Sequence, residues 1–504
     1  MSTITLSRHT PGRSLAIGVI CAAAVFLDLV VGGLHTAALT AGLAIGAVAV
    51  MVAARQPGVA LGIIAVFVPL QVALLALVFR LGAPAAMVKD LGYFKDAMTF
   101  GICIAALMAH VKRVPRRRLD RIDAFAGAYV GIATLYLAMP SIFPGSFGGQ
   151  SFTVRINAWR LDCLFVILMV AARRIPYSAR TLLRLRQVVI GVALVLCAVG
   201  IWEFLDGGSY NQFLGNTLRV PAYQNVVLHV APPPDNNYAA AFTSAGNGSA
   251  YSRIGSLLLN PLDMGFYIVV PFGLAFERML RGRTSLISVG LTAVTGLTLV
   301  LTETRSAVLG GVVIVVVCLW LNLRRASPGQ LRSTILVVVA LALAVPLSSH
   351  STIRARFASV SNPNSALDNQ EHVSRTKNGW HEVTTHPAGL GLGANPASGD
   401  RYGTTNATTT ENSYLQVGSE LGLAAMIAFI GLYLSLLQRL RRSAVALADS
   451  SIGSIASAVW FIGLGLLVGG MFLQVWIGFS VALTFWGLAG ATLGAAAEAQ
   501  PEPA

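Results

Sequence analysis

Long apolar runs separated by polar connections dominate the pattern of the chain. About fourteen runs are distinguishable, and each is about as long as a helix that crosses a hydrocarbon core of about 30 Å. They lie at roughly 14–33, 35–53, 58–80, 93–111, 122–143, 156–172, 187–205, 256–277, 284–302, 305–323, 333–349, 413–437, 452–472 and 475–494. The pattern predicts an all-α, polytopic transmembrane helix bundle of about 14 spans, with a large extracytoplasmic loop containing short helices.

The positions of lysine and arginine predict how these spans are oriented. Strongly basic stretches fall in every second connection, among them 112–121 (KRVPRRRLDR), 277–283 (ERMLRGR) and 439–442. The connections between them are short or nearly neutral, and it is cytoplasmic loops that are enriched in basic residues. We therefore expect both termini in the cytoplasm, the first run retained as a span, and the long loops 206–255 and 350–412 on the outer side.

This topology divides the chain into six successive parts. They are an N-terminal transmembrane bundle (1–205), an extracytoplasmic loop (206–255), a second transmembrane bundle (256–349), a large extracytoplasmic loop (350–412), C-terminal transmembrane helices (413–494) and a cytoplasmic tail (495–504).

Composition agrees with a membrane protein and excludes other classes. The chain is 55% hydrophobic and only 11% charged, and its mean hydropathy is +0.69. Its net charge of +15 does not indicate a nucleic-acid partner, because the basic residues are confined to the connections, where they set topology and contact anionic lipid. All five cysteines lie inside apolar runs, so neither a disulfide framework nor a metal site is predicted from them.

The two outer loops differ in character. Residues 206–255 are rich in turn-forming residues and show little helical periodicity, whereas STIRARFASV and VSRTKNGWHEVTTH in the second loop each predict a short amphipathic helix. The glycines of PAGLGLGAN (387–395) resemble a dinucleotide fingerprint, but no strand and helix surround them. We expect these glycines to allow a close approach of backbone segments instead.

Two arginines stand where outer connections become spans. Arg305 begins the run 305–323 after Thr302 and Thr304, either of which could cap the helix, and Arg253 precedes the run 256–277. A helix start with an arginine suits a phosphate or diphosphate. The alternative for each arginine is contact with lipid head groups. Two of them on one side of the membrane favour an outer anion site.

Glu411 and Asn412 precede the run 413–437. A carboxylate at this position is explained either by the helix dipole or by a role as general base at the boundary of water and lipid. Glu420 lies deeper in the same run, where an ionisable group is a functional candidate or the member of a structural pair. Arg375, His381 and His386 in the large loop are further candidates for substrate contact.

Taken in order, these motifs resemble the O-antigen ligase and polymerase superfamily. The similarity rests on RIGSLLLNP before one span, TETRSA before a later one, then SRTKNGW, HPAGLGLG and ENSYLQVGSELG, and it covers residues 250–437. The resemblance implies an integral-membrane glycosyltransferase of the bacterial inner membrane. Such an enzyme moves a glycan from a polyprenyl diphosphate carrier to an acceptor sugar at the outer face, without a metal or other cofactor.

The same resemblance implies roles for individual residues. Arg253 and Arg305 match the arginines that hold the diphosphate, Arg375 is a further loop position of the pattern, and Glu411 stands where many ligases have histidine. This departure, an E-N pair in place of H-N, slightly favours a polymerase of repeat units over a ligase. Polysaccharide export or chain-length proteins are further candidate partners.

The main alternative of another class is a transporter, because chains with about fourteen spans are common among exporters. Transport requires ionisable groups near the middle of the membrane. Asp28, Arg160, Asp162 and Asp263 are the candidates, although Arg160 and Asp162 are close enough in sequence to pair locally.

Overall fold

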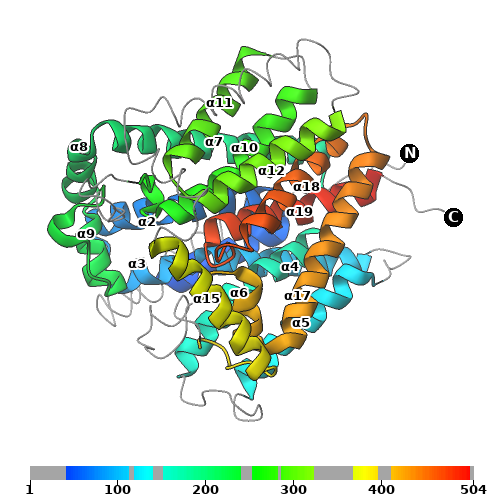
Figure 1. Ribbon diagram of the computed structural model, residues 1–504, viewed down its shortest axis with the longest axis horizontal. Coiled ribbons are helices and arrows are strands. Elements are labelled where there is room, and N and C mark those ends of the chain that lie inside the picture. The colour runs from blue at the N-terminus through cyan, green and yellow to red at the C-terminus, as the bar shows by residue number, and fades with distance from the viewer. Residues whose placement is uncertain are drawn as a thin grey trace.

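The described part of the protein is built from helices. The computed structural model describes residues 41–112, 119–139, 151–239, 253–281, 285–322, 367–394 and 410–499, and no strand occurs among them (Figure 1). The predicted spans 14–33 and 333–349, Asp28 and the predicted helix STIRARFASV lie outside these residues. The all-α prediction is confirmed for the residues described.

The longer helices overlap the predicted apolar runs, apart from α15, which lies in the predicted large loop. They are α2 (Pro57–Arg80), α4 (Phe94–Lys112), α5 (Arg121–Ala138), α6 (Phe152–Ala172), α7 (Ala179–Leu205), α10 (Pro261–Arg281), α11 (Leu286–Leu301), α12 (Arg305–Asn322), α15 (Leu367–Thr385), α17 (Ser413–Ala446), α18 (Ser451–Gly469) and α19 (Phe479–Ala499). Within the described residues, six helical stretches are long and apolar enough to cross a membrane. This confirms a polytopic helical membrane protein, and the count of fourteen spans stays a prediction.

Short polar residues start several of these helices. Asp120 accepts hydrogen bonds from the backbone of Ile122 and Asp123, and the Asp123 side chain accepts one from the Asp120 backbone, which completes a capping box for α5. Ser151 and Ser178 cap α6 and α7 in the same way. Such caps satisfy N–H groups that would otherwise have no partner at a helix start.

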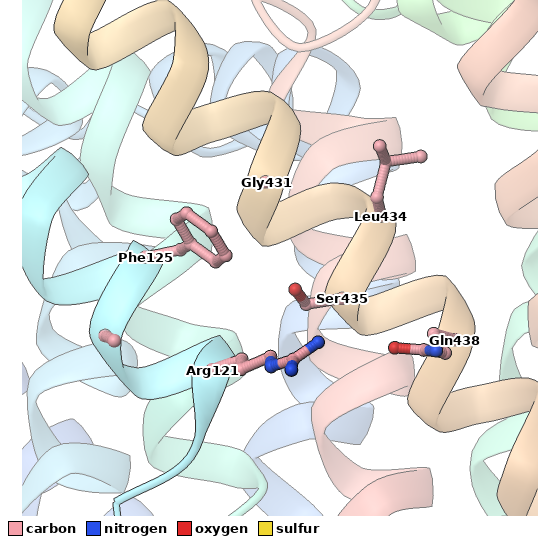
Figure 2. Close-up of a pocket in the computed structure, with 7 residues that line it drawn as sticks. Arg121, Phe125, Gly431, Leu434, Ser435 and Gln438 are labelled. Atoms are coloured by element: carbon pink, nitrogen blue, oxygen red, sulfur yellow. The ribbon is translucent and has the colours of Figure 1, made fainter.

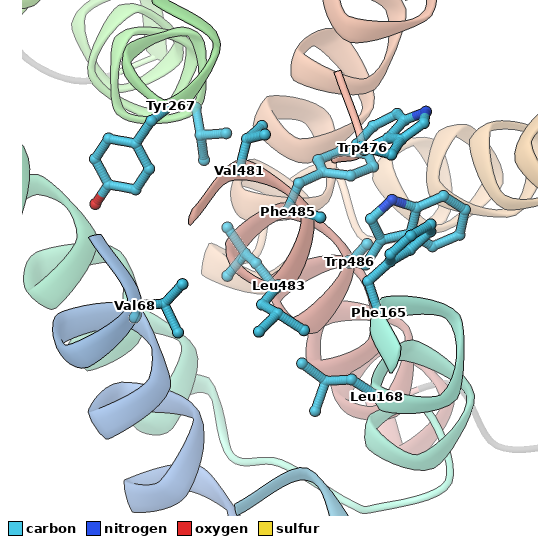
Figure 3. Close-up of a cluster of buried hydrophobic side chains, with 14 of the residues drawn as sticks. Val68, Phe165, Leu168, Tyr267, Trp476, Val481, Leu483, Phe485 and Trp486 are labelled. Carbon is cyan, nitrogen blue, oxygen red and sulfur yellow. The ribbon is translucent and has the colours of Figure 1, made fainter. Parts of the chain in front are cut away.

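The core is centred on α19, which lies between the two halves of the chain. Its Phe485 and Trp486 pack with Trp476 and with Phe165 of α6, at ring-centroid distances between 5.2 and 6.0 Å (Figure 3). In the most apolar stretch of α19, 94% of the residues are buried, so α19 is a central helix and not a peripheral one. The predicted N-terminal bundle and C-terminal helices therefore share one core.

The segment 206–239 was predicted to be a turn-rich loop, but it contains short helices. It contains the short helices α8 (Gly207–Gln212) and α9 (Val220–Tyr223), and each is followed by a single π turn. Tyr210 and Tyr223 are buried and hold the segment against the bundle, with the Tyr210 hydroxyl donating to the Ser256 carbonyl at 2.8 Å. Tertiary contacts of these tyrosines, which local periodicity does not report, stabilise the helical turns.

Helix ends that meet define two faces of the bundle. Arg173 after α6 meets Asp120 before α5, and Arg121 shares a cavity with Arg439 and Arg442 of α17. We call this face the basic end. The opposite face carries the first turns of α10, α12 and α17 and is called the site end below. The orientation of the two ends relative to the cytoplasm stays a prediction.

Candidate functional site at one end of the bundle

Helix α17 is broken near the site end. At Gly422 the backbone has φ 82° and ψ 171°, so an initial segment from Ser413 is followed by a bend and then by the long remainder of the helix. A left-handed φ of this size is accessible to glycine and strained for other residues. The initial segment is therefore a separate short helix that carries Glu411 and Asn412 at its start.

The glycine-rich loop after α15 fills this break. The N–H groups of Leu390 and Gly391 donate to the carbonyls of Ser419 and Glu420 at 2.7 and 2.9 Å, and the Leu423 N–H donates to the Pro387 carbonyl at 2.9 Å. The loop thus binds backbone groups that the interrupted helix leaves without helical partners, as required at membrane depth.

The predicted close backbone approach is confirmed at Gly389, and Gly422 of α17, which was not part of the prediction, lies opposite it. A Cβ added to Gly389 would lie 2.5 Å from the Gly422 nitrogen, and one added to Gly422 would lie 2.7 Å from the Ala388 carbonyl carbon. Both positions also have φ of +82°. No side chain fits at either place, so the two glycines join the large loop to α17.

The turn between α18 and α19 fixes the start of α17. The Asn412 side chain accepts from the N–H groups of Tyr414 and Leu415 at 2.9 and 3.0 Å and donates to the Met471 carbonyl at 2.9 Å. Ser413 donates from its backbone to the Gly470 carbonyl and from its hydroxyl to the Leu473 carbonyl. Asn412, predicted to contact substrate, is thus observed as a helix cap and an anchor.

Helix α15 lies beside α17 (Figure 1). It brings two nitrogen-bearing side chains to Glu411. Arg375 Nη1 contacts Glu411 Oε1 at 2.5 Å, and His372 Nδ1 contacts Glu411 Oε2. The Glu411 side chain is 15% exposed, and those of Arg375 and His372 are each 35% exposed. Each carboxylate oxygen therefore has its own partner, and the group stays accessible from outside.

The predicted helix in VSRTKNGWHEVTTH is confirmed and begins about two turns earlier, at Leu367. His372 and Arg375 are three residues apart on α15, a spacing that places both on one helix face. The sequence motifs do not assign His372 to the site. The signal that would have found it is this spacing, once the helix is extended toward its N-terminus.

Arg253 reaches the connection that starts α12. Its Nε donates to the Thr302 carbonyl at 3.2 Å, and its Nη2 donates to the Thr304 hydroxyl at 3.0 Å. The Thr304 carbonyl accepts the helical bond from the Val308 N–H, so Thr304 directly precedes α12 and Arg305 is its first residue. The structure therefore links Arg253 to the first turn that carries Arg305.

Backbone strain marks the same connection. Glu303, between Thr302 and Thr304, is 4% exposed and has φ of +50°. This left-handed conformation costs a non-glycine residue about 1–2 kcal/mol, so the surrounding contacts must impose it. It allows the chain to turn sharply from α11 into α12 at the site end.

The end of α18 connects the two groups of predicted site residues. A Cβ on Gly469 would lie 3.4 Å from the Ser306 carbonyl of α12, and the next residue, Gly470, accepts from the Ser413 N–H at 2.8 Å. The first turns of α12 and α17 therefore flank the same helix end. Arg305 and Glu411 start these turns on one face of the bundle.

Two predicted contact residues lie elsewhere on α15 and after it. His381 and His386 are exposed, and the His386 Nδ1 lies 3.1 Å from the Thr385 hydroxyl. The structure does not join either of them to Glu411. Among the described residues, no group of three or more histidine, cysteine, aspartate or glutamate side chains is arranged to hold a metal ion.

The ionisable groups within the bundle have defined partners. Arg160 donates to both carboxylate oxygens of Asp96 on α4 at 2.8 and 2.7 Å, so the predicted local pair with Asp162 is wrong. Asp162 is buried next to Glu420. Glu420 is 1% exposed, so its carboxyl group is buried inside the bundle. A helix places residues two positions apart on different faces, which is why Arg160 and Asp162 separate.

The fold and the site define an integral-membrane helical protein with a partly exposed, charged site at one end. Residues 290–430 match the family model described as O-antigen ligase. The match covers Arg305, His372, Arg375 and Glu411, so this stretch is similar to the O-antigen ligase and polymerase superfamily. It supports glycosyl transfer of the ligase or polymerase type in general. No curated protein matches the chain.

Proposed function

We propose that the protein transfers a polyprenyl-diphosphate-linked glycan to an acceptor sugar at the outer face of the cytoplasmic membrane, polymerising repeat units of a surface polysaccharide or exopolysaccharide. The observation that carries this proposal is the position of Glu411. It lies directly before the cap of α17 and contacts Arg375 and His372, on the same face of the bundle as Arg253 and Arg305.

Arg253 and Arg305 suit the binding of the donor. A diphosphate is multiply charged, and arginine is the side chain that pairs best with phosphate oxygens. The N-terminus of α12 adds the positive end of the helix dipole. As the bond between the anomeric carbon and the phosphate oxygen breaks, negative charge grows on the leaving diphosphate. Cationic groups already in place stabilise this charge.

Glu411 suits the activation of the acceptor. The attacking hydroxyl forms the new glycosidic bond and gives its proton to the carboxylate, while the diphosphate leaves with the electrons of the broken bond. The contacts with Arg375 and His372 fix the orientation of the carboxylate at the boundary of water and lipid. Arg375 and His372 are thus positioning residues in this proposal. Glu411 is the base.

Ligation is the second candidate function, and the name of the matched family favours it. A ligase transfers a finished glycan to a lipid or wall acceptor, whereas a polymerase extends the repeat. Polymerisation is preferred because Glu411 replaces the histidine expected from ligase motifs. The glycan profile of a deletion strain separates the two functions. Capped single repeats indicate a lost polymerase, and full-length polymer retained on its lipid carrier indicates a lost ligase.

Substitutions at Glu411 and at the arginines test the proposal directly. We expect Glu411→Gln to lower turnover by about 10²–10⁴-fold, the usual contribution of a general base, with little change in donor retention. Arg253→Ala and Arg305→Ala should abolish transfer through loss of donor binding, measured with purified protein and a labelled lipid-linked glycan.

Arg441→Ala is the matched control for these substitutions. Arg441 lies near the basic end and its guanidinium is 5.7 Å from the centre of the Trp460 ring. The Arg441→Ala substitution should therefore leave transfer unchanged. Unaltered polymer in cells that carry Arg305→Ala would contradict the enzyme function, and equal losses of turnover and donor retention in Glu411→Gln would reduce Glu411 to a binding residue.

A further inference from the structure

A groove between α5 and α17 lies at the basic end, away from the candidate site. It consists of two adjoining cavities of about 630 and 280 Å³ that share Arg121, Ser435 and Gln438 (Figure 2). Nothing in the proposed glycosyl transfer uses these residues. The groove is large enough for part of a lipid molecule.

One part of the groove is basic. Arg439 and Arg442 join Arg121 in lining the smaller cavity, and no ion pair or hydrogen bond connects any of the three to another residue in the described part of the chain. Asp120 also lines this cavity, but it pairs with Arg173. The groove therefore carries a net positive charge that the neighbouring carboxylate does not neutralise.

The second acidic side chain near the groove is also paired with arginines. Asp123, one turn along α5, pairs with Arg173 at 3.0 Å and with Arg174 at 2.7 Å. Neither Asp120 nor Asp123 therefore neutralises the arginines of the groove.

The other part of the groove is apolar and faces outward. Phe125, Ala124, Gly431 and Leu434 line the larger cavity, and Figure 2 shows Phe125 beside Gly431 and above Arg121. Leu434 is 50% exposed, and Ile427, two helical turns earlier, is 57% exposed. Apolar residues exposed at this spacing form the face of α17 that borders the lipid chains.

The dimensions agree with one leaflet of a bilayer. From Gly431 to Arg442 the helix advances eleven residues, or about 16 Å at about 1.5 Å per residue. Half of a hydrocarbon core of about 30 Å is about 15 Å. A lipid whose phosphate meets the arginines would therefore extend its acyl chain along the apolar part.

We propose that this groove binds one anionic phospholipid from the leaflet at the basic end. Arg121, Arg439 and Arg442 hold its phosphate, Gln438 and Ser435 face its glycerol region, and Phe125 and Leu434 contact an acyl chain. Basic pockets between membrane helices recognise anionic head groups by this chemistry. The proposal does not depend on the identity of the glycan that the site end accepts.

Lipid retention by the full-length protein tests the proposal. The protein is purified in mild detergent, stripped of lipid and mixed with phosphatidylglycerol or phosphatidylcholine, and bound lipid is counted by native mass spectrometry. We expect preferential retention of phosphatidylglycerol. The combined variant Arg121→Gln, Arg439→Gln and Arg442→Gln should weaken that retention by about a hundredfold, given the attraction of each arginine to an anionic surface.

Controls separate the groove from general charge effects. Arg441→Gln removes the same charge from the same helix, but from the side that contacts Trp460, and should keep full retention. Ala124→Leu, at an exposed position of the apolar part, should lower phosphatidylglycerol retention with all arginines intact. If the combined variant does not stay monodisperse, the single variant Arg442→Gln at an exposed position should still weaken retention about fivefold.

Two outcomes would overturn the proposal. Equal phosphatidylglycerol retention in Arg442→Gln and Arg441→Gln would show that the groove does not bind the head group. Displacement of the lipid by inorganic phosphate at an equal concentration would identify a site for small anions, with no contribution from the acyl chain.

Discussion

The two ends of the helix bundle use charged residues differently. At the basic end the Arg173 side chain is fully buried and contacts both Asp120 and Asp123, which belong to the capping box of α5. At the site end Glu411 contacts Arg375 and His372, whose side chains are each 35% exposed. A fully buried arginine such as Arg173 fixes the architecture, whereas the partly exposed arginine and histidine at the site end remain accessible to a ligand.

The backbone is regular at the basic end and interrupted at the site end. At the basic end α5 begins with a regular cap, and α6 runs unbroken to Arg173. At the site end α17 is interrupted at Gly422, and Glu303 has a left-handed conformation before α12. Irregular backbone at membrane depth occurs where it is covered by protein or lines a polar space. Strain of this kind is typical of functional sites.

Removal of a buried charge at the basic end should have the largest effect on stability. Arg173→Gln removes a fully buried charge from Asp120 and Asp123. Asp120 is 38% exposed and Asp123 keeps Arg174, so we expect a loss at the lower end of the usual range, about 3 kcal/mol. The partly exposed pair of Arg375 and Glu411 is screened by solvent, so Arg375→Gln should cost less than about 1 kcal/mol. Thermal unfolding of the purified proteins in detergent measures both losses.

The two variants should also separate in activity. Arg375→Gln should lower glycan transfer per folded molecule, whereas Arg173→Gln should lower only the amount of folded protein. A protein with Arg173→Gln that is as stable as the unaltered protein would contradict the structural role of the basic end. So would equal destabilisation by the two substitutions.

The break in α17 is the next target. Gly422→Ala places a Cβ 2.7 Å from the Ala388 carbonyl carbon at a φ of +82°, and strain and overpacking of this kind typically cost about 1–3 kcal/mol. Gly191→Ala in α7 is the matched control, because a Cβ there has open space around it. Alanine favours a helix over glycine by about 1 kcal/mol, so the control should be neutral or slightly stabilising.

Activity should follow the same pattern. The bent backbone at Gly422 binds the loop that follows α15, so its distortion should also displace Arg375 and His372 from Glu411 and lower transfer. If Gly422→Ala were as stable and active as Gly191→Ala, the loop would not depend on the break in the helix.

Hydropathy alone predicted most of the helices. The apolar run 305–323 corresponds to α12 at Arg305–Asn322, and the run 58–80 corresponds to α2 at Pro57–Arg80. Length and apolar composition suffice for this, because a membrane span must satisfy its backbone hydrogen bonds within itself. The break at Gly422 was not predicted. The run 413–437 reads as one helix, and the partner that stabilises the break lies about thirty residues earlier in the sequence.

Only part of the site was predictable from the sequence. Motif order identified Arg375 and Glu411, which the structure brings into contact. It also suggested His381 and His386, which lie away from Glu411, and it did not select His372. The face of α15 that meets α17 is set by tertiary packing, and local sequence does not specify it. For the same reason Asp96, 64 residues before Arg160, was not foreseen as its partner.

The smallest predicted effect concerns His372. As a positioning residue it contributes about one hydrogen bond to the orientation of Glu411, so His372→Gln should lower turnover by about tenfold. His381→Gln, on the exposed side of the same helix, should have no effect.

The pH dependence of turnover separates positioning from catalysis. The loss of a catalytic imidazole removes a titration near the ordinary histidine range, whereas the loss of an orienting contact lowers the rate at every pH. If His372→Gln were as inactive as Glu411→Gln, and the double variant no worse than either, the two side chains would act as one unit. The imidazole would then be the base, and Glu411 the group that orients it.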